Sequence, residues 1–156
     1  MSEQTAGTAG APEPILSVRD LAVAFGDSEA VSGVDLTVYP GQTVAIVGES
    51  GSGKTTTANA VLNLLPGTGH VTRGSIVFDG TELTTASKRD VDALRGSDIG
   101  LVPQDPMSNL NPLWRIGFQV REALEANNVA KGAAAKKRAA ELLAEAGMRD
   151  AEKRMN

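Results

Sequence analysis

One short stretch constrains this chain more than any other: Gly48-Glu49-Ser50-Gly51-Ser52-Gly53-Lys54-Thr55. It fits the pattern G-x-x-x-x-G-K-[ST] of a phosphate-binding loop, which lies between a buried strand and a helix. The apolar, β-branched run Thr43–Val47 before it predicts that strand. The residues Thr55–Leu65 after it predict the helix, which we expect to end at Pro66-Gly67. The expected apolar face of this helix comprises Ala58, Val61, Leu62 and Leu65.

The residue types indicate what this loop can bind. Gly48, Gly51 and Gly53 let the backbone turn successive N–H groups inward, and the helix N-terminus adds positive potential. Lys54 is expected to reach the β- and γ-phosphates of a triphosphate, and the Thr55 hydroxyl is expected to bind Mg²⁺. The same predicted binding site includes the other loop positions and the next residue, which are Glu49, Ser50, Ser52 and Thr56.

Composition narrows the possible partners. The 156 residues carry a net charge of -4, so the overall charge gives no reason to expect nucleic acid as a partner. There is no cysteine, which excludes disulfides and cysteine metal sites within these residues and fits a reducing cytoplasm. No apolar stretch approaches the roughly 20 residues of a membrane span, so we expect any membrane role to come through a partner.

The pattern before the loop is mainly that of strands. Met1–Pro14 is rich in Ala, Gly, Thr and Pro without periodicity, and we predict a disordered tail there. Two short β-like runs follow at Ile15–Arg19 and Leu21–Phe25, with a turn at Gly26-Asp27. Val34–Tyr39 alternates apolar and polar residues, which predicts a half-buried strand.

The pattern after the loop and its helix changes from strands to helices. First we expect a loop over 67–73, a strand over 74–80 that ends in an Asp79-Gly80 turn, and a short helix over 87–95. A buried strand over 98–102 and a non-helical loop over 103–112 should follow. The last predicted elements are amphipathic helices over 116–127 and 133–146, the second of which is stopped by Gly147.

Gln104-Asp105-Pro106, together with the phosphate loop, gives a family resemblance. Gln104 lies 104 − 54 = 50 residues after Lys54, close to where the nucleotide-binding domains of ATP-binding cassette (ABC) transporters keep their glutamine loop. The run from Gln104 to Pro112 resembles more specifically the dipeptide, oligopeptide and nickel importer subfamily. The resemblance extends from about Ile15 to Asn156.

This resemblance implies an α/β fold. It would be a P-loop NTPase core with an antiparallel β subdomain at the N-terminal side and the start of an α-helical subdomain, ABC-type and incomplete. After the tail at 1–14, we expect a partial ATP-binding domain over 15–156. Its parts are the β/P-loop core at about 15–103, the glutamine loop at 103–112 and the helical subdomain at about 113–156.

The resemblance also implies roles for individual residues. Phe25 would stack on adenine, although a plain core phenylalanine is the alternative. Gln104 would contact Mg²⁺ and the attacking water and sense the γ-phosphate, which an amide can do because it both donates and accepts. Asp105–Trp114 would face the membrane subunit, with Trp114 either an anchor of that interface or packed inside the helical part. The expected metal contacts are therefore Thr55 and Gln104.

The sequence departs from the family pattern in several places. Thr55 stands where many relatives have Ser, and Phe118 stands where this subfamily often has an acidic residue. No Ser-Gly-Gly signature loop, apolar strand ending in Asp-Glu, or switch histidine follows the helical region. Asp79 is expected in a turn rather than at a metal, and His70 in a solvated loop. We therefore expect a truncated domain with weak ATP binding, near-zero turnover and poor solubility.

The function that we expect is that of the ATPase subunit of an importer for di- and oligopeptides or nickel, acting through ATP-driven dimerisation. The expected partners are a second ATPase subunit placed head to tail, membrane permease subunits and, indirectly, an extracytoplasmic substrate-binding protein. The expected location is the cytoplasmic face of the membrane, and the expected cofactors are ATP and Mg²⁺.

Three alternatives stay open. One is a soluble phosphotransferase or GTPase, although no Asn-Lys-x-Asp motif for guanine is present. Another is a DNA-repair or translation-associated ABC protein, which the acidic balance disfavours. A third is a regulatory or non-functional nucleotide-binding fragment. The basic face over Lys131–Arg138 could touch lipid headgroups or simply be a solvated helix face.

Overall fold

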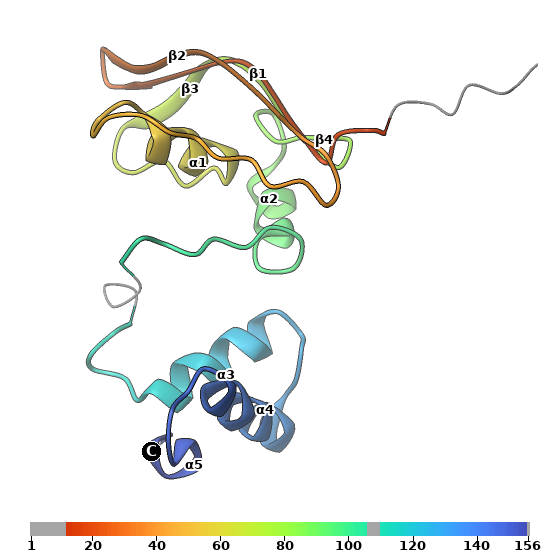
Figure 1. Cartoon of the computed structure of the whole chain (residues 1–156), viewed down its shortest axis with the longest axis vertical. Helices are drawn as coiled ribbons and strands as arrows, with labels where there is room; N and C mark the ends of the chain where they lie inside the picture. Colours follow the sequence, from red (N-terminus) through yellow and green to blue (C-terminus); the bar gives the residue numbers. More distant parts are fainter. Residues whose placement is uncertain (1–11, 106–109, 156) are drawn as a thin grey trace, which may run out of the picture. The chain divides into compact units, whose positions relative to one another are not determined.

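The computed structural model describes residues 12–105 and 110–155, which divide into two compact units, Met1–Arg95 and Gly96–Asn156 (Figure 1). Most of the predicted N-terminal tail, residues 1–11, lies outside the described residues. So does the middle of the predicted glutamine loop, residues 106–109. Each unit is built around its own group of buried side chains, and the two are taken in turn.

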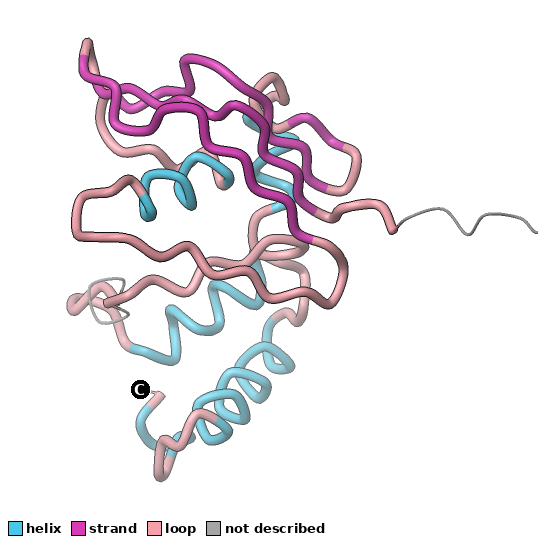
Figure 2. Tube along the Cα trace, turned by 45° about the horizontal axis from the view of Figure 1, so that its top comes forward, coloured by secondary structure: helices cyan, strands magenta, loops and turns pink. Residues whose placement is uncertain are grey.

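The first unit contains an antiparallel sheet of four strands. These are β1 (Leu16–Phe25), β2 (Ser28–Val38), β3 (Gly69–Phe78) and β4 (Thr81–Glu82), in the spatial order β2-β1-β3-β4. β1 and β2 form a hairpin around the predicted turn at Gly26-Asp27, and β1 pairs on its other side with β3. Figure 2 shows the long strands side by side, with α1 (Lys54–Val61) against one face.

β1 lies inside the sheet, between β2 and β3, and it carries three of the four largest fully buried side chains among the described residues. Val18, Leu21 and Val23 are completely buried, and Ile76 of β3 lies beside them. Each such side chain contributes about 1.5–3 kcal/mol by leaving water. The prediction of two separate runs over Ile15–Phe25 was wrong, because one strand covers them with an irregular register between Val18 and Leu21.

A bulge around Asp20 allows β1 to continue. Asp20 has a φ of 45°, its amide donates to Asp35 Oδ1 at 3.1 Å, and its carboxylate accepts from Arg73 Nε at 2.7 Å. The hydrogen bond from Arg73 to Asp20, aided by their opposite charges, raises the pKa of Arg73. Asp35 and Arg73 lie 15 and 53 positions away from Asp20 in the sequence. The local pattern therefore showed only an interruption at Asp20 between two apolar runs.

The second half of the sheet corrects one prediction and confirms another. The expected loop over 67–73 is wrong from Gly69 onward, because β3 begins there and His70 pairs with Ala24 of β1. His70 is exposed, as expected, but it lies on a strand. The turn at Asp79-Gly80 is confirmed: both residues have positive φ, 44° and 75°, as a two-residue hairpin turn requires.

α1 begins where predicted but ends earlier than expected. It runs over Lys54–Val61 and stops in a Schellman motif, with Asn63 at a φ of 51° and Leu64 N donating to Asn59 O at 2.8 Å. Pro66-Gly67 is therefore not the end of this helix. The helix buries Thr57, Ala60 and Val61, with Leu62 just beyond, whereas the predicted core position Ala58 is exposed.

Two predicted strands are not formed. Thr43–Val47 and Asp98–Val102 are irregular, apart from a single bridge at Ile99. Val47 is 88% exposed and Val102 is 91% exposed. Their apolar, β-branched sequences suit a parallel sheet buried on both faces, but such strands need hydrogen-bonding neighbours on both sides. The described residues do not provide those neighbours on both sides, so neither stretch forms a strand.

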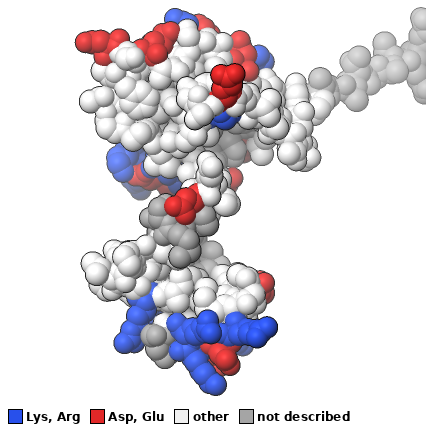
Figure 3. Space-filling view, turned by 60° about the vertical axis from the view of Figure 1, so that its left-hand side comes forward, with Lys and Arg blue, Asp and Glu red and all other residues white. Residues whose placement is uncertain are grey.

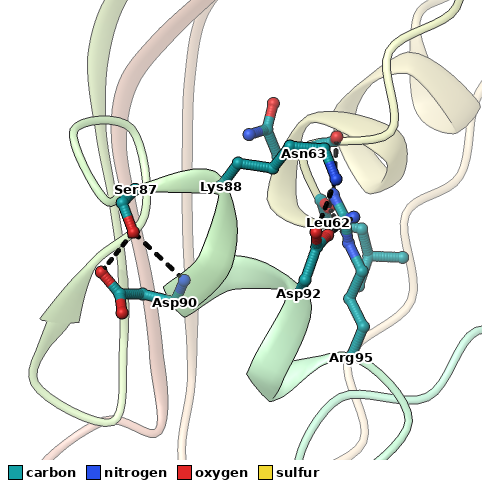
Figure 4. A network of polar contacts seen from close by, with 7 residues as sticks. All are labelled: Leu62, Asn63, Ser87, Lys88, Asp90, Asp92 and Arg95. Atoms are coloured by element: carbon teal, nitrogen blue, oxygen red, sulfur yellow. Dashed lines mark hydrogen bonds and ion pairs between the residues drawn. The ribbon is translucent and has the colours of Figure 1, made fainter. Parts of the chain in front are cut away.

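α2 (Lys88–Leu94) confirms the short helix predicted over 87–95. Ser87 caps it by accepting from Asp90 N at 3.3 Å, and Val91 is buried. At its C-terminal end Arg95 reaches across to the end of α1, as Figure 4 shows. Asp92 lies between Lys88 and Arg95, and the hydrogen bond from Lys88 and both positive charges lower its pKa.

The second unit is helical. It contains α3 (Ile116–Ala126), α4 (Gly132–Glu145) and the short, unpredicted α5 (Ala151–Arg154). α3 and α4 confirm the two predicted helices, and Gly147, at a φ of 90°, follows the end of α4. Their shared core consists of three alanines and two larger side chains: Ala135, Ala139, Ala140, Leu124 and Met155.

Basic side chains gather on this helical unit, as Figure 3 shows. Arg138 of α4 forms hydrogen bonds to Glu145 and Glu141 along its own helix, which raise its pKa. Lys137 lies 3.9 Å from Glu141. Much of the predicted basic face over Lys131–Arg138 is thus part of an ion-paired helix surface.

Candidate functional site

The phosphate loop lies in the first unit, between an extended segment and α1. Gly51 and Gly53 have φ values of 82° and 88°, in the left-handed region where a side chain is strained. Gly53 is the residue immediately before α1, and its carbonyl accepts from Thr57 N at 2.8 Å and from Thr57 Oγ1 at 2.9 Å. The sequence thus produces a loop that turns twice through left-handed backbone and enters a helix.

Two of the loop glycines are also required for space. A Cβ on Gly53 would lie 2.9 Å from Val31 Cγ2 and 3.2 Å from Ala30 O, because the loop passes close to β2. A Cβ on Gly48 would lie 2.7 Å from Ser52 Oγ, because the two ends of the loop approach each other. A Cβ on Gly51 would meet nothing within 4 Å. Gly51 is therefore needed only for its backbone angle.

The Lys54 ammonium is held inside the curve of the loop. Its Nζ donates to the carbonyls of Gly48 at 2.9 Å and Glu49 at 2.6 Å, with a longer contact to Ser52 Oγ at 3.4 Å. Ser52 N donates in turn to Glu49 O at 3.3 Å, which closes the loop across its base. A positive charge therefore lies beside the backbone amides at the start of a helix, an arrangement suited to a phosphate group.

A cleft of about 500 Å³ adjoins the loop within the first unit. It lies between β2 and the segment leading into the loop, and it is lined by Val34, Asp35, Leu36, Ala45, Ile46, Val47, Gly48, Ser52, Gly53, Lys54 and Thr57. Residues 48–51 are exposed along the loop, so a ligand can reach this part of the loop from solvent.

The other predicted binding residues of the first unit occupy different surroundings. Thr55 is exposed and Thr56 is half-buried on the first turn of α1, and Glu49 and Ser50 are exposed on the loop. Phe25 is half-buried at the end of β1, and its Cε1 would lie 2.7 Å from a Cβ on Gly69. Phe25 thus packs closely over a glycine of β3 while part of its ring stays accessible, and both its predicted role and the alternative remain predictions.

Gln104 lies in the second unit and is exposed. The predicted metal contacts, Thr55 and Gln104, thus belong to different units. Among the residues that the structure describes, no group of three or more His, Cys, Asp or Glu side chains could hold a metal ion. The loop and the first turn of α1 offer the hydroxyls of Ser50, Ser52 and Thr55 and the single carboxylate of Glu49, which fits an ion such as Mg²⁺ that is held mainly by substrate phosphates and water.

The second unit presents exposed apolar side chains before and within α3. Leu113 is 88% exposed and Trp114 is 55% exposed. The Trp114 ring stacks on Phe118 with the centroids 4.9 Å apart, and the Arg121 guanidinium lies 5.6 Å from the Phe118 centroid. Trp114 is therefore held in place by a neighbour and still offers much of its surface to a partner.

Sequence reasoning missed two polar residues near these features. Gln119 donates to the carbonyls of Asn111 and Trp114 at 3.0 and 2.9 Å and accepts from Asn111 N at 2.9 Å, so it fixes the turn before α3. Arg95 binds the end of α1. Neither belongs to a sequence motif. The only sequence signal is that Gln119 lies near the start of a predicted helix and Arg95 at the end of another.

Comparison with known proteins identifies relatives across almost the whole chain. The family model described as ABC transporter matches residues 31–156. The peptidoglycan transport ATP-binding protein YejF of Agrobacterium fabrum is 47% identical over 92% of this chain and 27% of its own length. The oligopeptide transport ATP-binding protein OppD of Bacillus subtilis is 43% identical over 91% of this chain and 41% of its own length. The chain therefore spans less than half the length of these relatives.

Solved structures agree with this match. The dimeric post-hydrolysis state of the ATP-binding cassette MJ0796 bound to ADP and Pi gives a TM-score of 0.73 at 25% identity, covering 89% of this chain and 60% of that one. A bacterial Atm1-family ABC exporter with ATP bound gives a TM-score of 0.56 over 76% of this chain. These neighbours confirm the predicted α/β fold of cassette type. Of the helices in residues 12–105 and 110–155, none has the length and apolar character of a membrane span.

Proposed function

Because this chain belongs to the ABC transporter family, we propose that it is the ATP-binding part of a transporter that takes up peptides. The observation that carries the proposal is the phosphate loop, with the Lys54 ammonium held among its carbonyls at the start of α1. Relatives named for peptidoglycan, oligopeptide and dipeptide transport favour peptides over nickel as the cargo.

Lys54 would receive the nucleotide by exchanging one of its contacts. An ammonium has three N–H donors, and three contacts of Lys54 Nζ already engage the loop. The contact to Ser52 Oγ is the longest, at 3.4 Å, so a phosphate oxygen would replace it at the smallest cost. The two carbonyl contacts would keep the ammonium aimed into the loop, while backbone amides of the exposed residues 48–51 would donate to the same phosphates.

The remaining binding residues would complete the nucleotide site. The exposed Thr55 hydroxyl would bind Mg²⁺, and the accessible part of the Phe25 ring would stack on adenine. Gln104 would contact the metal and the attacking water and sense the γ-phosphate. When bound, ATP would supply the γ-phosphoryl group whose presence drives pairing with a second ATPase subunit.

Coupling to the membrane would use the second unit. The exposed Leu113 and the half-exposed Trp114, braced by Phe118, offer an apolar surface of the kind that anchors protein interfaces. We assign this surface to membrane permease subunits, which places the chain peripherally on the cytoplasmic face of the membrane. We propose a β/P-loop core at about 15–103, a glutamine loop at 103–112 and a helical subdomain at about 113–156.

Turnover would need groups that these 156 residues do not contain. The sequence has no Ser-Gly-Gly signature, no Asp-Glu at the end of an apolar strand and no histidine besides His70. Within the chain there is thus no general base for the attacking water. We propose that the chain alone binds ATP without hydrolysing it.

Titration with a fluorescent ATP analogue in the presence of Mg²⁺ tests this function. Removing the Lys54 charge in Lys54→Ala is expected to weaken binding by roughly ten- to hundredfold, the effect of losing a charge-assisted hydrogen bond. Lys137→Ala is the matched control, because Lys137 is 82% exposed on the other unit. Equal affinity in the parent and Lys54→Ala would contradict nucleotide binding at this loop, and phosphate release that Lys54→Ala abolishes would contradict the lack of turnover.

A further inference from the structure

Arg95, which lies at the end of α2, makes its contacts at the end of the helix that carries the phosphate loop. Its Nε donates to Leu62 O at 2.9 Å, and its Nη2 donates to Leu62 O at 2.6 Å and to Asn63 O at 2.8 Å. Its Nη1 donates to Asp92 of α2. The side chain is only 26% exposed, and Figure 4 shows it pointing from α2 toward the last residues of α1.

These contacts meet a specific need of α1. The last carbonyls of a helix have no partner within the helix and carry negative partial charge. The Schellman motif uses Asn59 O and Ala60 O, which accept from Leu64 N and Asn63 N. The carbonyls of the C-cap residue Leu62 and of Asn63 just beyond it are both bound by the guanidinium of Arg95. A planar group with a fixed fork of donors suits two neighbouring carbonyls, and lysine could not reproduce that geometry.

α1 is short, so its two ends are mechanically close. It has eight residues, about 12 Å of helix, between Lys54 and Val61. An isolated helix of this length is unstable in water, so α1 depends on the packing of its buried face, Thr57, Ala60 and Val61, and on the contacts at its ends. The first turn of α1 carries Lys54 and Thr55, and Gly53 immediately before it accepts from Thr57. Fraying from the C-terminal end would therefore reach the loop within two turns.

We propose that Arg95 is a positioning residue for nucleotide binding, acting through α1 to hold the phosphate loop in its binding geometry. The inference rests on the proposed binding of ATP at that loop. Arg95 itself would not touch the nucleotide, because it binds the opposite end of the helix. Asp92 fixes the guanidinium from the α2 side, so the position of α1 is tied to a second helix 33 residues later in the chain.

The test measures nucleotide affinity and amide hydrogen exchange in the full chain. In Arg95→Ala we expect affinity for the fluorescent ATP analogue to fall by about threefold to tenfold, the size expected for a residue that acts without touching the ligand. Exchange should accelerate by at least about fivefold at residues 62–64 and also at the loop amides 51–57. Arg89→Ala is the matched control, because Arg89 is an exposed arginine on the same helix, α2.

Arg95→Lys separates charge from geometry and covers the case in which Arg95→Ala does not fold. It keeps the positive charge and one hydrogen bond, so affinity and loop exchange are expected to fall between those of the parent and Arg95→Ala. Faster exchange confined to residues 62–64, with parent-like affinity in both variants, would overturn the proposal, because Arg95 would then only cap the helix.

The same measurements distinguish failure of this inference from failure of the proposed function. If Lys54→Ala weakens binding and the Arg95 variants do not, nucleotide binding stands and the role of Arg95 is refuted. If the parent protein binds no nucleotide, both are refuted together.

Discussion

Gly53 allows a quantitative test of why the phosphate loop has its shape. Replacing it with alanine in Gly53→Ala has two costs. The first is the backbone angle, because a φ of 88° places an L-residue in the left-handed region at about 1–2 kcal/mol. The second is crowding, because the new Cβ would lie 2.9 Å from Val31 Cγ2 and 3.2 Å from Ala30 O. Overpacking of this kind costs about 1–3 kcal/mol.

Gly51→Ala has only the first cost, so its comparison with Gly53→Ala isolates the second. Gly51 has nearly the same φ, 82°, but nothing lies within 4 Å of its added Cβ. We expect Gly51→Ala to lower the free energy of unfolding by about 1–2 kcal/mol, and Gly53→Ala to lower it by about 2–5 kcal/mol. The difference between the two variants measures the close approach of the loop to β2.

The assay is urea unfolding followed by far-UV circular dichroism, with hydrogen exchange at β1 and α1 as a local measure. Tryptophan fluorescence is a poor choice, because the one tryptophan, Trp114, lies in the other unit. Val31→Ala, combined with Gly53→Ala in a double-mutant cycle, should recover about 1 kcal/mol, since it removes the methyl that the new Cβ meets. Equal destabilisation by Gly51→Ala and Gly53→Ala, with no coupling to Val31, would refute the reasoning.

Two further predictions concern Glu82 and Thr55. Burial would raise the pKa of Glu82, but hydrogen bonds from the Thr84 hydroxyl and the Ile76 and Thr84 amides outweigh it and lower that pKa. The stabilising effect of the Glu82 carboxylate is therefore present above the ordinary pKa of a glutamate and is lost as the pH falls through the lowered pKa. In Glu82→Gln, the free energy of unfolding measured by chemical denaturation should therefore fall less steeply as the pH is lowered. Glu122→Gln, at an exposed glutamate, is the control. An equally steep fall in Glu82→Gln and the parent protein would contradict this. Thr55→Val keeps the side-chain shape but removes the hydroxyl, so ATP-analogue affinity in Mg²⁺ should fall toward the value in EDTA; a full Mg²⁺ response would exclude Thr55 as a metal contact.

Local features of the sequence predicted local features of the structure well. The phosphate loop, the Asp79-Gly80 turn and the start of α1 depend on backbone angles that particular residues favour, and each is found where expected. The amphipathic helices α3 and α4 follow from a repeating pattern within one segment. What the sequence could not predict was how distant segments satisfy each other, as in the contacts of Asp20 with Asp35 and Arg73.

The premature end of α1 shows this limit at the site itself. Thr55–Leu65 has the composition of a longer helix, and Pro66-Gly67 predicts its end. Asn63 stops the helix sooner by adopting a left-handed conformation, which asparagine tolerates better than most residues. The carbonyls left at that end are then bound by Arg95, a partner that no pattern within α1 can reveal.

The same reasoning explains the two strands that did not form. A helix such as α3 satisfies its backbone within a single segment, whereas a buried parallel strand is satisfied only by neighbours from elsewhere in the chain. Thr43–Val47 and Asp98–Val102 have sequences suited to such a strand, yet Val47 and Val102 remain almost fully exposed. Their apolar, β-branched sequences therefore indicate a position between two neighbouring strands of a buried sheet. If those neighbours are strands of an ABC cassette, these two stretches should show the largest gain in hydrogen-exchange protection when such strands pair with them.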